Sequence, residues 1–170
     1  MIANKILILG SPCSGKTTFS KSLGNILNIK VYSLDWLFWR PNWKKTSKSE
    51  RISILKELYK NEKQWIIEGN YNNVLEYQLK HSKTVILLNF SRYTCLVRLL
   101  KKKFSHIIGK RFEVAPGCMD KIDWKYIKSI WLYPSRDLAV LNTIIENSKC
   151  SFEMILLNNP SDLNIFMDKI

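Results

Sequence analysis

An eight-residue loop near the start of the chain constrains the fold more than any other feature of the sequence. Residues 10–17 are Gly-Ser-Pro-Cys-Ser-Gly-Lys-Thr and match the pattern G-x-x-x-x-G-K-[ST]. The loop follows the apolar run 5–9, and the helical spacing of apolar residues begins at 16. A phosphate-binding loop needs this order of strand, loop and helix, because loop N–H groups and the helix N-terminus surround the phosphates. The sequence therefore predicts a nucleoside triphosphate site.

Most residues of this loop have a predicted role in holding ATP and Mg²⁺. Gly10 and Gly15 permit backbone geometry that a side chain would obstruct. Lys16 is expected to reach the β- and γ-phosphate oxygens, and the Thr17 hydroxyl is expected to ligate Mg²⁺. Thr18 would add a contact to the α-phosphate. The remaining members of the predicted ATP-binding loop are Ser11, Pro12, Cys13 and Ser14.

The composition limits the chain to a few classes of protein. With 170 residues, of which 46% are hydrophobic, residues 1–170 are expected to form a single domain. The four cysteines are widely spaced and form no C-x-x-C pair, which argues against a zinc site or a disulfide scaffold. No apolar stretch approaches the roughly 20 residues needed to cross a bilayer. We therefore expect a cytoplasmic location and no membrane partner.

Alternating apolar runs and helical spacings predict an α/β fold. Apolar runs occur at 5–9, 30–34, 64–68, 84–90 and 152–157. Helices are predicted at 16–27, 47–61, 92–104 and 121–147. This alternation is typical of a parallel sheet flanked by helices, in which ligands bind beyond the carboxyl ends of the strands. Residues that directly follow each strand are therefore the first candidates for chemistry.

The second predicted strand ends in an acid followed by aromatic residues. Asp35 precedes Trp36, Phe38, Trp39 and Arg40. Such a group is suited to orient an acceptor hydroxyl and to stack a ring. The alternative is an Asp helix cap followed by core aromatics. Asp35 is our candidate for the group that orients the acceptor or removes its proton.

The third predicted strand ends in Glu68-Gly69-Asn70-Tyr71. Glu68 occupies the position at which a carboxylate would hold Mg²⁺ through water. Gly69 permits close approach of a ligand. The structural alternative is a strand-end acid that faces solvent.

A basic segment without carboxylates spans 98–111. It contains Arg98, Lys101, Lys102, Lys103, Lys110 and Arg111. Arg98 and Lys102 are four residues apart and share one helix face, so a lid built on this segment would bring cations to the γ-phosphate. Arg136 would approach the site from another side. The alternative is a solvated, lysine-rich helix, and the net charge of +13 equally suits nucleic acid, phosphorylated ligands or a biased surface composition.

Several of these blocks together resemble a known family. The segments 8–17, 32–39 and 65–71, with Arg98, Pro116-Gly117-Cys118, Trp131 and Arg136, are similar to the bacterial DNA topology modulation protein (FlaR-like) family. That family is grouped with adenylate kinase-related P-loop proteins. The resemblance implies a nucleoside-monophosphate-kinase-like fold with a five-stranded parallel sheet, an acceptor-side region at about 36–62 and a short lid at about 102–120.

The resemblance also implies roles for particular residues. Arg98 would contact the nucleotide, and the loop that contains Asn158 and Pro160 would lie against the adenine. Adenylate kinases have an Asp-Gly-x-Pro-Arg block after the third strand, and its arginine helps to hold AMP. The corresponding Glu-Gly-Asn-Tyr stretch at 68–71 contains no arginine, which argues against AMP as the acceptor.

Two hypotheses of function follow from the sequence. The preferred one is a Mg²⁺-dependent kinase that transfers the γ-phosphoryl of ATP to a small acceptor, acting as a monomer or a homodimer. Its predicted catalytic residues are Lys16, Asp35, Arg98 and Arg136, and its predicted acceptor site consists of Asp35, Trp36, Trp39, Glu68, Gly69, Asn70 and Tyr71. The competing hypothesis is a nucleic-acid-associated ATPase or regulator whose basic face 98–136 makes non-specific contacts with nucleic acid.

Overall fold

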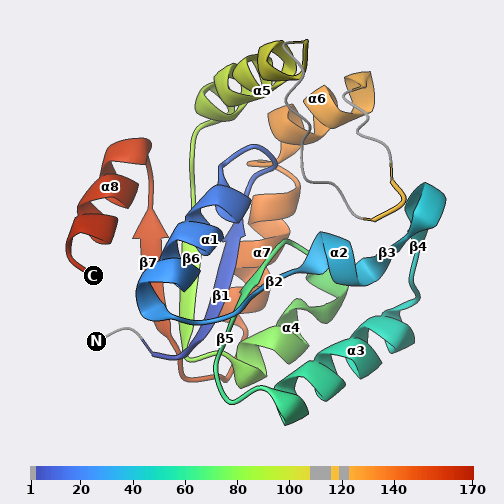
Figure 1. Ribbon diagram of the computed structural model, residues 1–170, viewed down its shortest axis with the longest axis vertical. Coiled ribbons are helices and arrows are strands. Elements are labelled where there is room, and N and C mark those ends of the chain that lie inside the picture. Colours follow the sequence, from blue (N-terminus) through green and yellow to red (C-terminus); the bar gives the residue numbers. More distant parts are fainter. Residues whose placement is uncertain (1–2, 108–115, 119–122) are drawn as a thin grey trace.

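A computed structural model describes residues 3–107, 116–118 and 123–170 of the chain. A five-stranded sheet has the strand order β2-β5-β1-β6-β7, and β3 and β4 form a separate hairpin (Figure 1). The strands are β1 (Lys5–Gly10), β2 (Val31–Ser33), β3 (Trp39–Arg40), β4 (Lys44–Lys45), β5 (Trp65–Glu68), β6 (Thr84–Leu88) and β7 (Glu153–Leu157). The helices are α1 (Lys16–Leu27), α2 (Leu34–Phe38), α3 (Lys48–Asn61), α4 (Asn72–His81), α5 (Arg92–Ile107), α6 (Trp124–Leu132), α7 (Asp137–Glu146) and α8 (Pro160–Asp168). A 3-10 turn, Pro41–Trp43, joins β3 to β4.

All pairings in the large sheet are parallel, so the predicted α/β fold with a five-stranded parallel sheet is confirmed. β1 lies in the middle, paired with β5 through Ile6 and Ile66 and with β6 through Ile6 and Thr84. The chain leaves β1 toward β2 on one side and reaches β6 and β7 on the other. The order of strands thus reverses beside β1, and the phosphate-loop sequence lies at that reversal, where open α/β sheets bind ligands.

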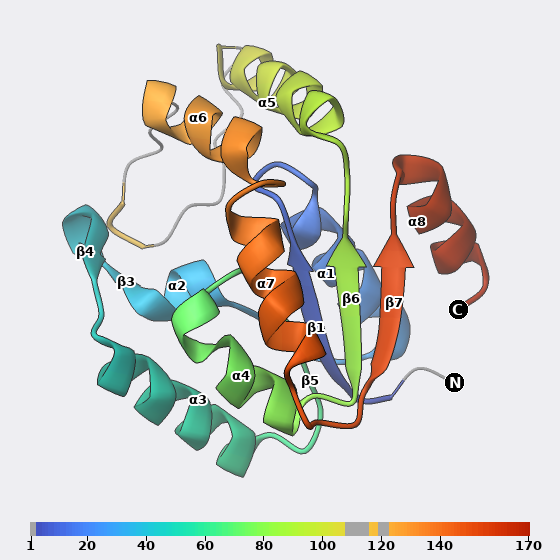
Figure 2. The ribbon, with the colours of Figure 1, turned by 180° about the vertical axis from the view of Figure 1, so that it is seen from behind.

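The alternating side chains of the strands form two cores. Ile6 and Ile8 of β1 pack with α1 and α8 on one face, whereas Leu7 and Leu9 pack with α3, α4 and α7 on the other. Figure 2, from behind, shows α4 and α7 in front of the sheet and α1 beyond it. Because both faces are covered there, β1, β5 and β6 are buried apolar runs, which explains why they were recognisable from the sequence. The two helical layers leave the carboxyl ends of the strands open.

The prediction of one continuous helix over 121–147 is wrong. The described part of this segment contains two helices, α6 and α7, separated by turn residues 133–136. Pro134 has no backbone N–H and its ring clashes with the preceding turn, so a continuous helix is disfavoured there. Tyr133, at the end of α6, is buried. The break therefore places a buried tyrosine at the corner between the two helices.

The acceptor-side region begins with a short hairpin that the sequence patterns did not predict. Trp39 of β3 packs edge-on against Trp43, with ring centroids 5.3 Å apart. The Asn42 N–H donates to the Gly117 carbonyl at 3.1 Å, so the hairpin contacts part of the predicted lid. The lid positions 108–115 and 119–120, which include Lys110 and Arg111, lie outside the described residues. Among the described residues, no helix combines the length and the apolar character required to cross a bilayer.

Candidate active site

The loop between β1 and α1 has the backbone form that its glycines predict. Gly15 has a φ of 93°, in the left-handed region, and a Cβ atom there would lie 2.9 Å from Nη1 of Arg98. At Gly10, a Cβ atom would lie 2.7 Å from the Leu88 carbonyl oxygen. Both positions therefore require glycine for conformation or space. The loop packs against β6 on one side and against α5 on the other.

Lys16 folds back over this loop. Its ammonium group donates to the carbonyls of Gly10 and Ser11, both at 2.8 Å. Burial lowers the pKa of Lys16, while the nearby charges of Glu68 and Asp35 oppose that shift. The ammonium group is thus held at the loop, with the charges of two carboxylates nearby, where phosphate oxygens would bind.

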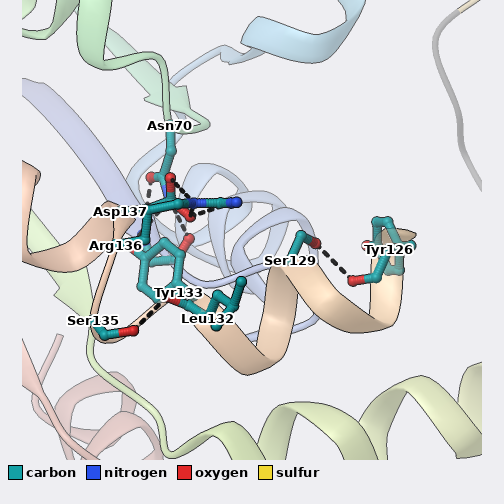
Figure 3. Close-up of polar contacts among 9 residues, drawn as sticks. Asn70, Tyr126, Ser129, Leu132, Tyr133, Ser135, Arg136 and Asp137 are labelled. Atoms are coloured by element: carbon teal, nitrogen blue, oxygen red, sulfur yellow. Dashed lines mark hydrogen bonds and ion pairs between the residues drawn. The ribbon is translucent and has the colours of Figure 1, made fainter. Parts of the chain in front are cut away.

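Asn70 closes the loop from the neighbouring strand β5. Its Oδ1 accepts from the Gly10 N–H at 3.1 Å, and its Nδ2 donates to the Gly10 carbonyl at 2.5 Å. The same Nδ2 donates to the Tyr133 hydroxyl at 3.1 Å, as Figure 3 shows. Asn70 was predicted as an acceptor-site residue, and in the structure its amide ties the phosphate loop to the corner between α6 and α7.

Two oxygen groups meet at the start of α1. The Thr17 hydroxyl donates to Oε1 of Glu68 at 3.1 Å, and Glu68 is 4% exposed. A hydroxyl beside a carboxylate is a hard donor set that fits Mg²⁺, which keeps several water ligands and phosphate oxygens in kinase sites. The described residues hold no cluster of three or more His, Cys, Asp or Glu suited to a metal ion. The residues present thus fit a Mg²⁺ ion that the nucleotide shares, and not an all-protein cage.

Arg98 reaches the loop from α5. Its Nη1 donates to the Ser14 carbonyl, and its guanidinium lies over the Phe90 ring, 4.9 Å from the centroid. The fork of the guanidinium therefore lies beside Gly15 and against the phosphate loop. Arg98 and Lys102 line the same cavity, and their contact with the γ-phosphate remains a prediction.

Asp35 lies at the start of α2, just beyond the carboxyl end of β2. Its Oδ1 accepts from the Tyr71 hydroxyl at 2.6 Å. Burial, and secondarily the charge of Asp35, raise the pKa of Tyr71 well above its usual range, so the phenol stays protonated and donates. A hydrogen bond from the Trp39 side chain acts on the same phenol. The hydrogen bond from Tyr71 thus holds one carboxylate oxygen of Asp35 in place. The other oxygen takes its orientation from that bond.

Tyr71 is itself held by a buried cation. Arg51 of α3 is 6% exposed, and its guanidinium lies 4.9 Å from the Tyr71 ring centroid and 5.4 Å from that of Phe38. Its Nε donates to the Thr46 hydroxyl at 3.2 Å and its Nη1 to Oδ1 of Asn73 at 3.3 Å. Stacking of a desolvated guanidinium on aromatic rings is favourable. Arg51 therefore supports the tyrosine that positions Asp35.

A single cavity of about 1090 Å³ joins the loop to the acceptor side. It is lined by Pro12, Cys13, Gly15, Lys16, Thr17, Thr18, Phe19, Lys21, Ser22, Asn25, Ser33, Asp35, Trp36, Trp43, Glu68, Gly69, Asn70, Arg98, Lys102, Tyr126, Leu163, Asn164 and Met167. The cavity therefore combines the predicted phosphate loop, metal-binding pair, basic helix and acceptor-side residues in one space.

Other predicted site residues are not among the described residues that line this cavity. Arg136 forms an ion pair with Asp137 at 2.8 Å, drawn in Figure 3. Asn158 donates its N–H to Asp162 at 2.8 Å, and Pro160 is the first residue of α8. Their roles in binding remain predictions.

The lining residues that were not predicted as site residues include Trp43 and three residues of α8. Trp43 follows Asn42, and both have positive φ angles, which directs the turn toward the cavity in a way that no pattern indicated. Leu163, Asn164 and Met167 come from α8, whose Pro160 and Asn159 cap were a recognisable helix start. That signal predicts the helix and does not predict which face meets the cavity.

The structure was compared with known proteins. No protein-family model matches the chain, and no curated protein sequence matches it. A shikimate kinase from Acinetobacter baumannii in complex with shikimate is similar, with a TM-score of 0.58 and 14% identity over 97% of this chain and 89% of that one. A shikimate kinase from Bacteroides thetaiotaomicron is similar with a TM-score of 0.55 and 17% identity, over 96% of this chain and 94% of that one. A deoxyadenosine kinase from M. mycoides with bound dCTP is similar with a TM-score of 0.51 and 13% identity, over 97% of each chain.

These similarities define the fold as that of small P-loop kinases. The loop geometry, the central β1 and the cavity at the carboxyl ends of the strands agree with that class. At these identities, the comparisons establish the fold and leave the reaction to be argued from the site.

Proposed function

We propose that the protein is a Mg²⁺-dependent kinase that transfers the γ-phosphoryl of ATP to a hydroxyl group of a small molecule. The observation that carries this proposal is the shared cavity, in which the loop residues Lys16 and Thr17 and the acceptor-side Asp35 line one space. A protein that only bound ATP would have no need for an oriented carboxylate in that space. The FlaR-like resemblance is compatible with such a kinase and does not specify its acceptor.

The proposed step exchanges one phosphorus–oxygen bond for another. The acceptor oxygen forms a bond to the γ-phosphorus, the bond from that phosphorus to the β–γ bridging oxygen breaks, and ADP leaves with the electron pair. The acceptor proton passes to the Asp35 oxygen that does not accept from Tyr71. Lys16 and Arg98 stabilise negative charge on the transferred group.

Mg²⁺ would be held by the Thr17 hydroxyl and, through water, by Glu68. When bound, the ion neutralises charge on the β- and γ-phosphates. Asn70 keeps the loop backbone in place through Gly10, and Arg51 keeps Tyr71 against Asp35. Positioning and charge therefore supply the catalysis, with no covalent enzyme intermediate.

An ATP-consumption assay with purified compounds tests this proposal. Nucleosides including deoxyadenosine, nucleoside monophosphates, shikimate, sugars and duplex DNA are added singly with Mg²⁺ and ATP. We expect stimulation by a small hydroxyl compound, with its phosphate ester as product, and loss of that activity in Lys16→Ala. Lys56→Ala, a matched loss of a lysine on the exposed surface of α3, retains activity. Activity that survives Lys16→Ala contradicts the proposal.

The described surface of α5 and α6 supports a second candidate function, binding of single-stranded nucleic acid. Tyr93, Phe104 and Trp124 are 66–75% exposed, and neither helix contains an acidic residue. Aromatic side chains among lysines are suited to stack bases and to contact phosphates. A salt titration of binding to a labelled oligonucleotide tests it, because binding that disappears by about 0.15 M salt is non-specific charge attraction alone.

A further inference from the structure

We propose that the acceptor is an uncharged hydroxyl compound with a flat or apolar ring face, and not a phosphate monoester or a carboxylate. This inference rests on the proposed kinase function and names the class of its acceptor. The acceptor side of the cavity is formed by the exits of β2 and β5 and by the hairpin turn. Its described lining residues are Ser33, Asp35, Trp36, Trp43, Glu68, Gly69 and Asn70.

The described lining residues on this side of the cavity carry only negative charge. Asp35 and Glu68 are carboxylates, and none of the other described lining residues on this side is basic. The basic lining residues Lys16, Lys21, Arg98 and Lys102 come from α1 and α5, on the phosphate side. An anionic acceptor would lie beside the Asp35 carboxylate and the phosphates of ATP, while Glu68 is engaged with Thr17 and the proposed Mg²⁺. Like charges in such a space repel, whereas a neutral hydroxyl donates a hydrogen bond to the carboxylate.

The described cations of the neighbouring elements are not among the lining residues of the cavity. Arg40 and Lys44, in the hairpin strands, are exposed. Lys45 lies over the Trp39 ring, 5.4 Å from its centroid. The buried Arg51 stacks on Tyr71 and donates to Thr46 and Asn73. None of these four side chains is among the described residues that line the cavity.

Aromatic side chains form the remaining wall. Trp36 is 50% exposed and Trp43 is half-buried, and both line the cavity beyond Asp35. Indole rings offer large apolar faces on which another ring stacks, and each also has an N–H donor. Exposed apolar surface of this kind is common in ligand sites. A ring that stacks on this wall would present its hydroxyl substituent toward Asp35.

The charge class can be tested before the acceptor is identified. A deproteinised bacterial extract is passed over anion- and cation-exchange columns at pH 7, which gives a neutral fraction and two charged fractions. Each fraction is incubated with the full-length protein, Mg²⁺ and γ-labelled ATP in excess, and labelled phosphate esters are counted. Lys16→Ala and Lys56→Ala serve as the matched pair. We expect the neutral fraction to give about tenfold more Lys16-dependent ester than either charged fraction.

The outcomes distinguish the two levels of the proposal. Lys16-dependent ester from a charged fraction alone overturns the uncharged acceptor and leaves the kinase intact. No ester from any fraction overturns the kinase itself, and the inference falls with it. With the neutral fraction as acceptor, Trp36→Ala is expected to need about tenfold more of that fraction for half-maximal rate. The KM for ATP is expected to stay unchanged. Trp131→Ala, which removes a 44% exposed tryptophan of α6 that is not among the described lining residues, leaves both quantities unchanged. If the two tryptophan variants need the same amount of the neutral fraction for half-maximal rate, the result contradicts stacking of the acceptor on Trp36.

Discussion

Replacement of Asn70 by alanine tests how the phosphate loop is held. Asn70→Ala removes an acceptor for the Gly10 N–H at 3.1 Å and a donor to the Gly10 carbonyl at 2.5 Å. It also removes the donor to the Tyr133 hydroxyl at 3.1 Å, and Tyr133 is only 4% exposed. Three hydrogen bonds at about 1 kcal/mol each, with a further penalty of about 1–3 kcal/mol for the buried phenol left unpaired, give a loss of about 4–6 kcal/mol.

Urea denaturation with and without MgATP measures this effect. We expect a lower midpoint with an unchanged m-value for Asn70→Ala, and ATP binding about tenfold weaker because the loop loses its brace. Asn89→Ala is the matched control, since Asn89 makes one exposed hydrogen bond to Asn158 at 3.0 Å. That variant should lose less than about 1 kcal/mol. An Asn70→Ala protein as stable as the Asn89→Ala protein would refute the bracing role.

Three further predictions concern the proposed chemistry. Asp35→Asn should reduce kcat by on the order of 10²–10⁴, with little change in ATP affinity, because it removes the proton acceptor but keeps a partner for Tyr71. Glu68→Gln should raise the Mg²⁺ concentration needed for half-maximal rate, because the carboxylate beside Thr17 is lost. ATP binding should be accompanied by proton uptake at alkaline pH, because burial lowers the pKa of Lys16 and phosphate charge raises it again.

The pH dependence of proton uptake follows from the lowered pKa of Lys16. Below the lowered pKa of Lys16 the amine is protonated before and after binding, so no proton is taken up. ATP affinity is then highest, and it falls as the pH rises through the pKa of the complex. Calorimetry in two buffers of different ionisation enthalpy measures the uptake, and its persistence in Lys16→Ala would exclude Lys16 as the source.

For Asp35→Asn, an unchanged kcat would count against proton transfer to Asp35. For Glu68→Gln, an unchanged Mg²⁺ requirement would remove Glu68 from the metal site.

The parts of the fold that depend on local pattern were predictable from the sequence. Strands buried on both faces are continuous apolar runs, and the glycine-lysine loop has a fixed spacing, so both were recognisable without a structure. The parallel arrangement then explains why Asp35 and Glu68 line the same cavity. Each directly follows a strand or ends one, and the carboxyl ends of parallel strands lie at one edge of the sheet.

Features that depend on tertiary contacts were not predictable in the same way. A polar residue after a strand has the same sequence signal whether it faces a ligand or the backbone, and the amide of Asn70 faces the backbone of Gly10. The basic character of α5 did not reveal that Arg98 donates to the Ser14 carbonyl. Pro134, by contrast, was a local signal for the break between α6 and α7, and the apolar spacing around it obscured that signal.

The most direct measurement of the central claim is ³¹P NMR of the protein with MgATP and an unfractionated, deproteinised bacterial extract. A kinase predicts a new phosphomonoester resonance that grows as the γ-phosphate resonance of ATP declines, in the wild type and in Lys56→Ala but not in Lys16→Ala. Growth of the inorganic phosphate resonance alone, or a phosphomonoester that appears equally with Lys16→Ala, would contradict phosphoryl transfer at this site.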